Sequence, residues 1–259
     1  MSNLQKAVNA INRRVVNAWP TKPIIGRLTA PIASISFDDF PHSAWAQGGS
    51  ILEAAGVQGT YYVSRAFAPA NQSMAQGRVE GVQYYELDDI VEAHKQGHEI
   101  GCHSFQHVNL PELTNAQIEQ SIDDNAEFIR HLLGDVVMTS FAYPQGQASL
   151  RTKKLLSKRF AVSRGTSFGL NSGVFDFSKL SCIELLPDIL QKKPIAQLIE
   201  KAKSANAWLI FATHDVTDSP SPWGCTPELL RSLVSELCSH GIEILPVKSA
   251  AAKVVFPDG

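Results

Sequence analysis

Short apolar or β-branched runs alternate with amphipathic segments along the chain, which indicates strands that alternate with helices. The runs predict strands at residues 32–37, 59–64, 99–100, 136–141, 160–163, 181–185, 207–213 and 242–246. The amphipathic segments predict helices in the later part of residues 45–56 and at residues 87–96, 115–133, 150–158, 195–204 and 227–239. Thr114 with Gln117 forms a capping-box pattern before the third of these. Repeated strand–helix units favour a parallel sheet, either open or closed into a barrel.

The domain organisation follows from length and from the absence of linkers. The chain has 259 residues, and α/β barrels commonly run to about 250 residues as one unit. No repeat or Pro/Gly-rich tract divides the sequence, so we expect an N-terminal arm at residues 1–30 and a single domain at residues 31–259. In the arm, an apolar patch of Val15, Val16 and Trp19 is expected to pack on the domain. Residues 165–180 are expected to form a loop, either lining the site or acting as a surface connection.

Composition narrows the possible partners and the compartment. The formal net charge is −2 with no basic run, which gives no electrostatic reason to expect a nucleic acid or an anionic membrane as partner. No window of about 18 apolar residues predicts a transmembrane helix, and the polar N-terminus lacks the apolar core of a secretory signal. The four cysteines lack a disulfide-framework spacing, so we expect free thiols and a cytoplasmic protein.

Two polar clusters, each directly after a predicted strand, suggest metal chemistry. Asp38 and Asp39 follow the strand at 32–37, and adjacent carboxylates repel each other unless a cation or a proton lies beside them. Alternatively, Asp38 caps a turn and Asp39 is solvated. His103 and His107 are four residues apart, a spacing that lets two imidazoles face one ion. With one aspartate they give the two-nitrogen, one-oxygen composition of a catalytic zinc site.

The set and order of four motifs extend this interpretation. Together they resemble the motifs of polysaccharide deacetylases with a NodB-type homology domain (carbohydrate esterase family 4-like): Asp38-Asp39, His103-Ser-Phe-Gln-His107, the Phe-Ala-Tyr-Pro-x-Gly segment at residues 141–146, and His214 after a late apolar strand. The resemblance covers roughly residues 30–250. It implies an irregular (β/α) barrel with seven strands, a fold class that periodicity alone does not separate from an open sheet.

The resemblance also implies a metal centre. Its ligands are Asp39, His103 and His107, and the bound ion activates a water molecule and polarises the substrate carbonyl. Zinc fits these ligand types, and Co²⁺, Ni²⁺, Mn²⁺ or Fe²⁺ are accepted by the same set.

Catalytic roles follow from the same resemblance. Asp38 is implied as the general base, His214 as the general acid, and the backbone N–H of Tyr143 as the oxyanion donor. Many family members carry an Arg that pairs with the base where this chain has Ala142. Arg164, near the end of a predicted strand, is our candidate to replace it.

Substrate contacts are expected from Pro144, Trp223 and Arg164. Trp223 lies in a Ser/Pro-rich loop and either stacks on a sugar or packs within the loop. Asp215 directly follows His214, but neighbours on a strand diverge, so we do not assume that it orients this ring. Asp176, Glu184 and Asp188 are also candidates.

These observations predict a hydrolase that acts on linear amide bonds. It would remove an N-acetyl group from an amino sugar, with surface-polysaccharide or O-antigen biosynthesis as one setting. One alternative keeps the fold and the metal but acts on a non-sugar amide, as in relatives that resemble allantoinases. The other is a non-catalytic carbohydrate-binding protein with a retained metal site.

Overall fold

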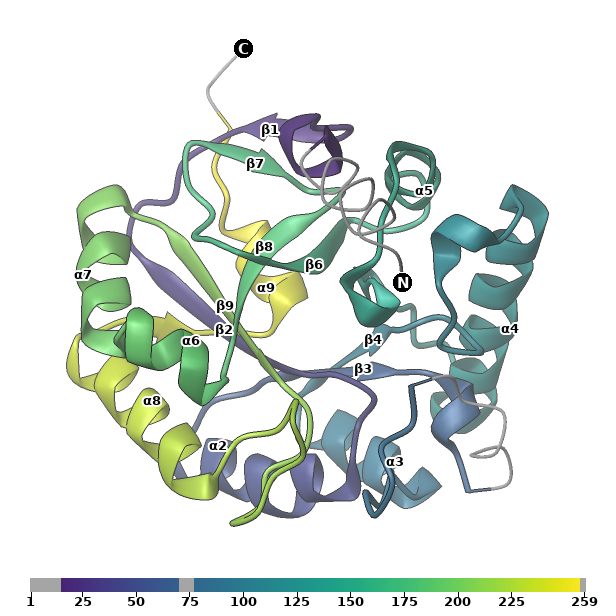
Figure 1. The fold of residues 1–259 in the computed structure, drawn as a ribbon, viewed down its shortest axis with the longest axis horizontal. Coiled ribbons are helices and arrows are strands. Elements are labelled where there is room, and N and C mark those ends of the chain that lie inside the picture. The colour runs from purple at the N-terminus through teal and green to yellow at the C-terminus, as the bar shows by residue number, and fades with distance from the viewer. Residues whose placement is uncertain (1–14, 70–76, 257–259) are drawn as a thin grey trace, which may run out of the picture.

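Parallel strands close into a barrel in the computed structural model, which describes residues 15–69 and 77–256 (Figure 1). Within these residues the ring has seven strands: β2 (Ile32–Phe37), β3 (Thr60–Val63), β4 (Glu99–Cys102), β5 (Ser140–Ala142), β6 (Val162–Phe168), β8 (Leu180–Glu184) and β9 (Trp208–Thr213). Each strand pairs with the next, and β2 pairs with β9 to close the ring. The short strand β10 (Glu243–Ile244) adds to the start of β2. The prediction of a seven-stranded barrel is confirmed.

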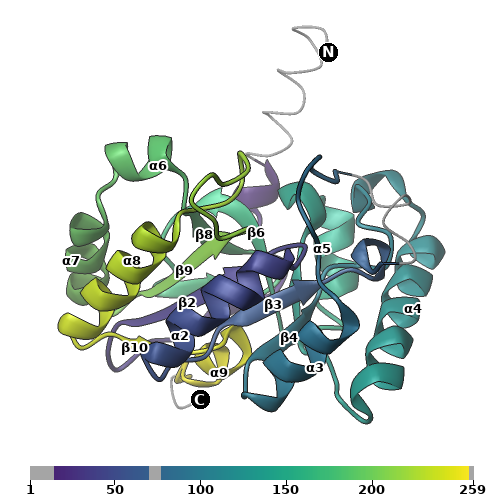
Figure 2. The same cartoon turned by 90° about the horizontal axis from the view of Figure 1, so that it is seen from below.

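Helices surround the strands and one helix lies across an end of the barrel (Figures 1 and 2). The surrounding helices are α2 (Ser50–Ala54), α3 (Leu87–Lys95), α4 (Asn115–Leu133), α5 (Leu150–Leu156), α6 (Pro187–Lys192), α7 (Ile195–Ala205) and α8 (Pro227–Ser239). Helix α9 (Val247–Ala252) meets the first residues of β3 and β4, because its Val247 and Lys248 N–H groups donate to Thr60 and Glu99 at 2.9 and 2.8 Å. It therefore covers the N-terminal end and leaves the opposite end for the site. Among the described residues, none of the helices combines the length and the hydropathy of a membrane-spanning segment.

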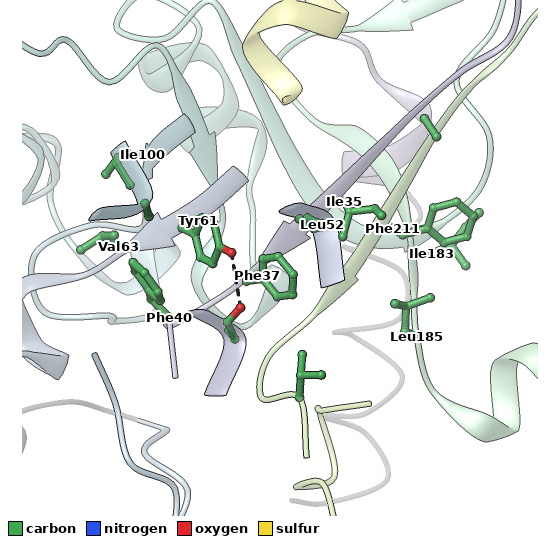
Figure 3. Packing of buried hydrophobic residues seen from close by; sticks show 14 of the residues in the cluster. Ile35, Phe37, Phe40, Leu52, Tyr61, Val63, Ile100, Ile183, Leu185 and Phe211 are labelled. Atoms are coloured by element: carbon green, nitrogen blue, oxygen red, sulfur yellow. Dashed lines mark hydrogen bonds between the residues drawn. The ribbon is translucent and has the colours of Figure 1, made fainter. Parts of the chain in front are cut away.

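Alternation along the strands sorts side chains to the two sides of the wall. Ile35, Ile183 and Phe211 are neighbours in register on β2, β8 and β9, and Figure 3 shows them packed together. Phe37 stacks on Tyr61 with ring centroids 4.8 Å apart. Residues of the other parity form a second buried cluster with α9: these include Ile32, Val162, Cys182, Trp208 and Ile210. Both sides of each strand are thus packed, which fixes the register on which the site depends.

The arm is attached to the barrel through a buried lysine. Strand β1 (Pro23–Ile25) pairs antiparallel with β7 (Val174–Asp176). The fully buried Lys153 of α5 donates through Nζ to the carbonyls of Val16 and Trp19, both at 2.7 Å, and lies 2.6 Å from Asp176. Val16 is buried, whereas the other two residues of the predicted apolar patch, Val15 and Trp19, are exposed. The part of the predicted arm at residues 1–14 lies outside the described residues.

Most predicted elements are present in the structure, but several differ in their bounds. The strand predicted at 160–163 is β6, which runs from Val162 to Phe168, and the strand predicted at 242–246 is limited to β10. Helices α4 and α8 have the predicted bounds, and the Thr114 side chain accepts from the Gln117 N–H as a capping box requires. The strand predicted at 136–141 is wrong in length, because only residues 140–142 join the ladder of β6. The loop predicted at 165–180 is wrong for about half of its length, since β6 continues to Phe168 and β7 pairs with the arm.

Replacing the buried lysine tests how the arm is held. Lys153→Met leaves Asp176 without its cation, so we expect the free energy of unfolding at pH 7 to fall by about 3–5 kcal/mol. Burial raises the pKa of Asp176. Its contacts with Lys153 and Ser178 lower this pKa by a larger amount, so the net pKa is below its ordinary value. The stabilisation is therefore present above the unfolded pKa and is lost as the pH falls through the folded one.

Chemical denaturation of both proteins across this pH range measures the effect. Lys154→Met, at the exposed neighbouring position, is the matched control and should change stability by less than about 0.5 kcal/mol. Equal stability of the Lys153 variant and the wild type would contradict the assignment.

Candidate active site

Three strand ends bring the predicted catalytic residues to the same edge of the barrel. The pairing of Phe37 with Thr213 places Asp38 next to His214, and the Asp38 N–H donates to the Thr213 carbonyl at 2.9 Å. His103 directly follows β4, and its N–H donates to the Val63 carbonyl at 3.0 Å. All of these groups lie at the C-terminal ends of their strands, the edge where α/β barrels collect their working residues.

Left-handed backbone is concentrated in the loops at this edge. Positive φ occurs at Asp39 (60°), Phe40 (50°), Ser104 (63°), His107 (52°) and Gln145 (56°). Side chains with a Cβ rarely adopt this conformation, and each instance costs on the order of 1–3 kcal/mol that the surroundings must offset. Two of these residues are predicted metal ligands, so the strain falls where the side chains must turn toward one point.

Asp39, His103 and His107 form a cluster with the dimensions of a metal site. Oδ1 of Asp39 lies 3.4 Å from Nε2 of His103 and 3.2 Å from Nε2 of His107, and all three residues are buried. Neighbouring ligands of a tetrahedral ion with bonds of about 2.0–2.1 Å are roughly 3.3 Å apart, which matches both separations. Among the described residues, Asp39 Oδ1 has no hydrogen-bond partner. The residues present therefore fit a divalent metal.

The tautomer of His103 is set by its other ring nitrogen. Nδ1 donates to the Ala142 carbonyl at 2.8 Å, so Nε2 carries the lone pair and faces Asp39. Burial raises the pKa of Asp39, but His107 and His103 outweigh it and the net pKa is lowered. Burial lowers the pKa of His103, while Asp39 and Asp38 raise it above its ordinary value. The Asp39 carboxylate in this cluster is thus kept ionised although it is buried, and it attracts a cation.

Asp38 is held by a buried arginine from β6. The Arg164 guanidinium forms an ion pair with Asp38 Oδ1 and lies over the Tyr62 ring, 4.7 Å from its centroid. Burial raises the pKa of Asp38, but Arg164, then His103 and His214, lower it below its ordinary value. Arg164 is fully buried, so the prediction that it contacts substrate is corrected: it lies behind the carboxylate.

The predicted ligands, base and acid share one pocket of about 330 Å³. Its walls are formed by Asp38, Asp39, Gly77, His103, His107, Gln145, Gly146, Thr166, Glu184, His214 and Trp223. His214 Nε2 lies 3.8 Å from Asp39 Oδ2, and Trp223, which is 49% exposed, lies beside it. The predicted acid and the predicted metal ligands are thus close enough to act on one acetyl group.

The direct hydrogen-bond partner of the His214 ring is a backbone carbonyl. The ring Nδ1 donates to the Trp223 carbonyl at 3.2 Å. Of the three carboxylates proposed from sequence for this role, Asp176 is paired with Lys153. Among the described residues, neither Glu184, which lines the pocket, nor Asp188 forms a hydrogen bond to His214. Burial, and then Asp38, raise the pKa of Glu184.

Two predictions for the Phe-Ala-Tyr-Pro-x-Gly segment are wrong. The Tyr143 N–H donates to the Arg164 carbonyl at 3.0 Å, so it is not available as an oxyanion donor, and its hydroxyl donates to the Ser178 carbonyl at 2.9 Å. Pro144 is buried and is not among the residues that line the pocket. Gln145 lines the pocket instead, and among the described residues its backbone N–H has no acceptor. Gln145 itself has left-handed backbone, which the Pro-x-Gly pattern suggests only in outline.

Comparison with known proteins gives matches of two kinds. A family model described as polysaccharide deacetylase matches residues 26–159, just over half of the chain. That segment includes the predicted metal ligands and Asp38, whereas Arg164 and His214 lie beyond it. A search of curated proteins finds no match.

Several solved structures share the fold at low identity. A T48 deacetylase with substrate is 18% identical over 88% of this chain and 94% of its own, with a TM-score of 0.58. A family 4 acetyl xylan esterase from Clostridium thermocellum, in complex with a cobalt ion, is 22% identical over 84% and 89%, with a TM-score of 0.57. The peptidoglycan deacetylase PdaC from Bacillus subtilis is 15% identical over 87% and 92%, with a TM-score of 0.53.

Removal of one histidine tests the metal site directly. We expect His103→Ala or His107→Ala to weaken Zn²⁺ or Co²⁺ binding by about 100-fold or more, because each removes one of three ligands. Isothermal titration of the metal-free protein measures the affinity. His131→Ala, on the exposed face of α4, is the control and should bind as the wild type does. Unchanged affinity in both site variants would place the metal elsewhere.

Proposed function

We propose that this chain, which belongs to the polysaccharide deacetylase family and is therefore a deacetylase, removes an N-acetyl group from an amino sugar with one divalent metal ion. The observation that carries the proposal is the convergence of three groups in one pocket. These are the Asp39–His103–His107 cluster, the Arg164-paired Asp38, and His214. Together they offer a metal site, a base and an acid in one pocket.

We assign a residue of this chain to each step of amide hydrolysis. A divalent metal bound by Asp39, His103 and His107 supplies Lewis acidity and makes water a stronger acid. Asp38 accepts the proton of the attacking water while Arg164 keeps this carboxylate ionised and fixed. The Gln145 N–H donates to the carbonyl oxygen as negative charge develops on it.

The leaving amine receives its proton from His214. Nδ1 keeps its hydrogen through the bond to the Trp223 carbonyl, so the proton that is transferred is the one on Nε2. Nε2 points to the Asp39 side of the pocket, at 3.8 Å from Oδ2. The base, Asp38, and the acid, His214, are thus separate groups. When the C–N bond breaks, the nitrogen takes the proton from His214 and the amine leaves as a neutral molecule.

The pocket wall supports a saccharide substrate. The half-exposed Trp223 offers an aromatic face to a sugar ring, and Thr166 and Glu184 offer hydrogen-bonding groups to its hydroxyls. Among the described residues, those that line the pocket include no Lys or Arg. This favours an uncharged or amino saccharide over a nucleotide-linked sugar, whose phosphates need cationic partners.

Acetate release from a substrate panel tests the proposal. Metal-loaded protein should release acetate from N-acetylated oligosaccharides faster than from nucleotide-linked N-acetyl sugars. Hydrolysis of cyclic ureides or imides without acetate release would favour the non-sugar amide reading. Saccharide binding without any hydrolysis would favour the non-catalytic one.

The base is tested by Asp38→Asn. We expect turnover to fall by about 10²- to 10⁴-fold, because the amide cannot accept the proton of the attacking water. Metal content should stay at the wild-type level, since Asp38 is not in the three-ligand cluster. Asp135→Asn, at an exposed position away from the pocket, controls for the substitution itself. Full activity of the Asp38 variant would rule out its role as the base.

Arg164 is tested through the pH profile. The pKa of Asp38 is lowered in part by Arg164, so the base stays ionised in acid. Arg164→Met should raise that pKa and move the acidic limb of the kcat/KM profile to higher pH by about 1–3 units. Arg164→Lys keeps the charge and should give a smaller shift, which separates charge loss from misfolding. An acidic limb at the same pH in all three proteins would contradict the pairing of Arg164 with the base.

A further inference from the structure

The loop at residues 215–225, which we call the Asp215 loop, contacts the pocket in two ways. Trp223 lines the pocket, and its ring centroid lies 6.5 Å from that of His214. The Trp223 carbonyl accepts from both His214 Nδ1 and the His214 N–H, each at 3.2 Å. One residue thus supplies the aromatic wall and the group that orients the proposed acid.

The carboxylate of Asp215 folds this loop. Asp215 is buried, with 4% exposure, and its Oδ2 accepts from the Ser221 N–H at 2.8 Å. Its Oδ1 accepts from the Ser221 hydroxyl, and its carbonyl accepts from the Cys225 N–H at 2.9 Å. The Ser221 hydroxyl oxygen in turn accepts from the Trp223 N–H at 3.3 Å. A continuous series of hydrogen bonds therefore runs from Asp215 through Ser221 and Trp223 to His214.

Gly224 allows the carboxylate to approach the backbone. A Cβ at this position would lie 2.6 Å from both Cγ and the carbonyl oxygen of Asp215, closer than real Cβ atoms come to other atoms. The carbonyl is backbone, so the contact is not relieved by a change of rotamer. Any larger residue must displace the Asp215 loop.

We propose that Asp215 is a positioning residue that acts through Ser221 and the Trp223 backbone to set the His214 ring, and that also fixes the Trp223 side chain on the pocket wall. The inference rests on the proposed function for the roles of His214 and Trp223. It adds that proton donation and sugar contact are coupled through one loop. A substitution that displaces the loop changes both, whereas one that removes only the Trp223 ring changes sugar contact alone.

Kinetics separate these two effects. Trp223→Ala keeps the carbonyl, so KM should rise by about 2- to 10-fold with kcat nearly unchanged. Gly224→Ala, Ser221→Ala and Asp215→Ala displace the carbonyl, and kcat should fall by about tenfold or more in addition to the rise in KM. Asp215→Asn keeps one acceptor oxygen and should recover part of kcat relative to Asp215→Ala. Ser219→Ala, an exposed position in the same loop, should behave as the wild type.

An activity-independent readout accompanies the kinetics. In ¹⁵N-labelled metal-loaded protein, with the His214 signals assigned by comparison with His214→Gln, the wild-type ring should show a protonated Nδ1. Gly224→Ala and Ser221→Ala should shift these signals or average the two nitrogens, whereas Trp223→Ala should not. Unshifted His214 signals in Gly224→Ala and Ser221→Ala would overturn the proposal. A change in KM without a fall in kcat in these two variants would also overturn it. If the wild type releases no acetate, the proposed function fails while the nitrogen signals still decide the positioning.

Discussion

The pairing of β2 with β9 is the constraint from which the site follows. The two strands are far apart in sequence, yet they pair over all six residues and close the ring. The same register sets Asp38 against Thr213, so the acidic pair at one strand end and His214 at the other become neighbours. Apolar packing of Ile35 and Phe211 on the outer face holds this register, because a slip of one residue would turn every side chain to the opposite face. The core and the catalytic geometry are therefore fixed by the same contacts.

Two adjacent buried carboxylates give each aspartate a different task. Asp38 is satisfied by Arg164, which arrives from the middle of β6 and has no route to solvent. Asp39 faces two imidazoles and keeps an oxygen without a hydrogen-bond partner among the described residues. The pairing with Arg164 keeps Asp38 as a fixed anion that can accept a proton. The surroundings of Asp39 favour the binding of a cation. Left-handed backbone at Asp39 lets the two side chains diverge over so short a distance.

Sequence reasoning succeeds where the signal is local. The periodicity of α4 and α8 predicts their bounds, and the order of the acidic and histidine motifs predicts which residues meet. It fails where the deciding contact is distant in sequence. Strand β7 exists because the arm pairs with it, and the polar residues of β6 are strand only because both neighbours in the ring bind them. The role of oxyanion donor moves from Tyr143 to Gln145 because the Tyr143 N–H already donates to the Arg164 carbonyl in the sheet. The pattern of residue types does not reveal that hydrogen bond.

The position of a bound metal tests the account most directly. Crystals grown with Zn²⁺ or Co²⁺, with diffraction measured at the absorption edge of that metal, would locate the ion without reference to activity. We predict one strong anomalous peak about 2.0–2.2 Å from a carboxylate oxygen of Asp39 and from Nε2 of both His103 and His107. Asp38 should remain against Arg164, with His214 across the pocket. A peak bound elsewhere, or no peak at saturating metal, would contradict the account.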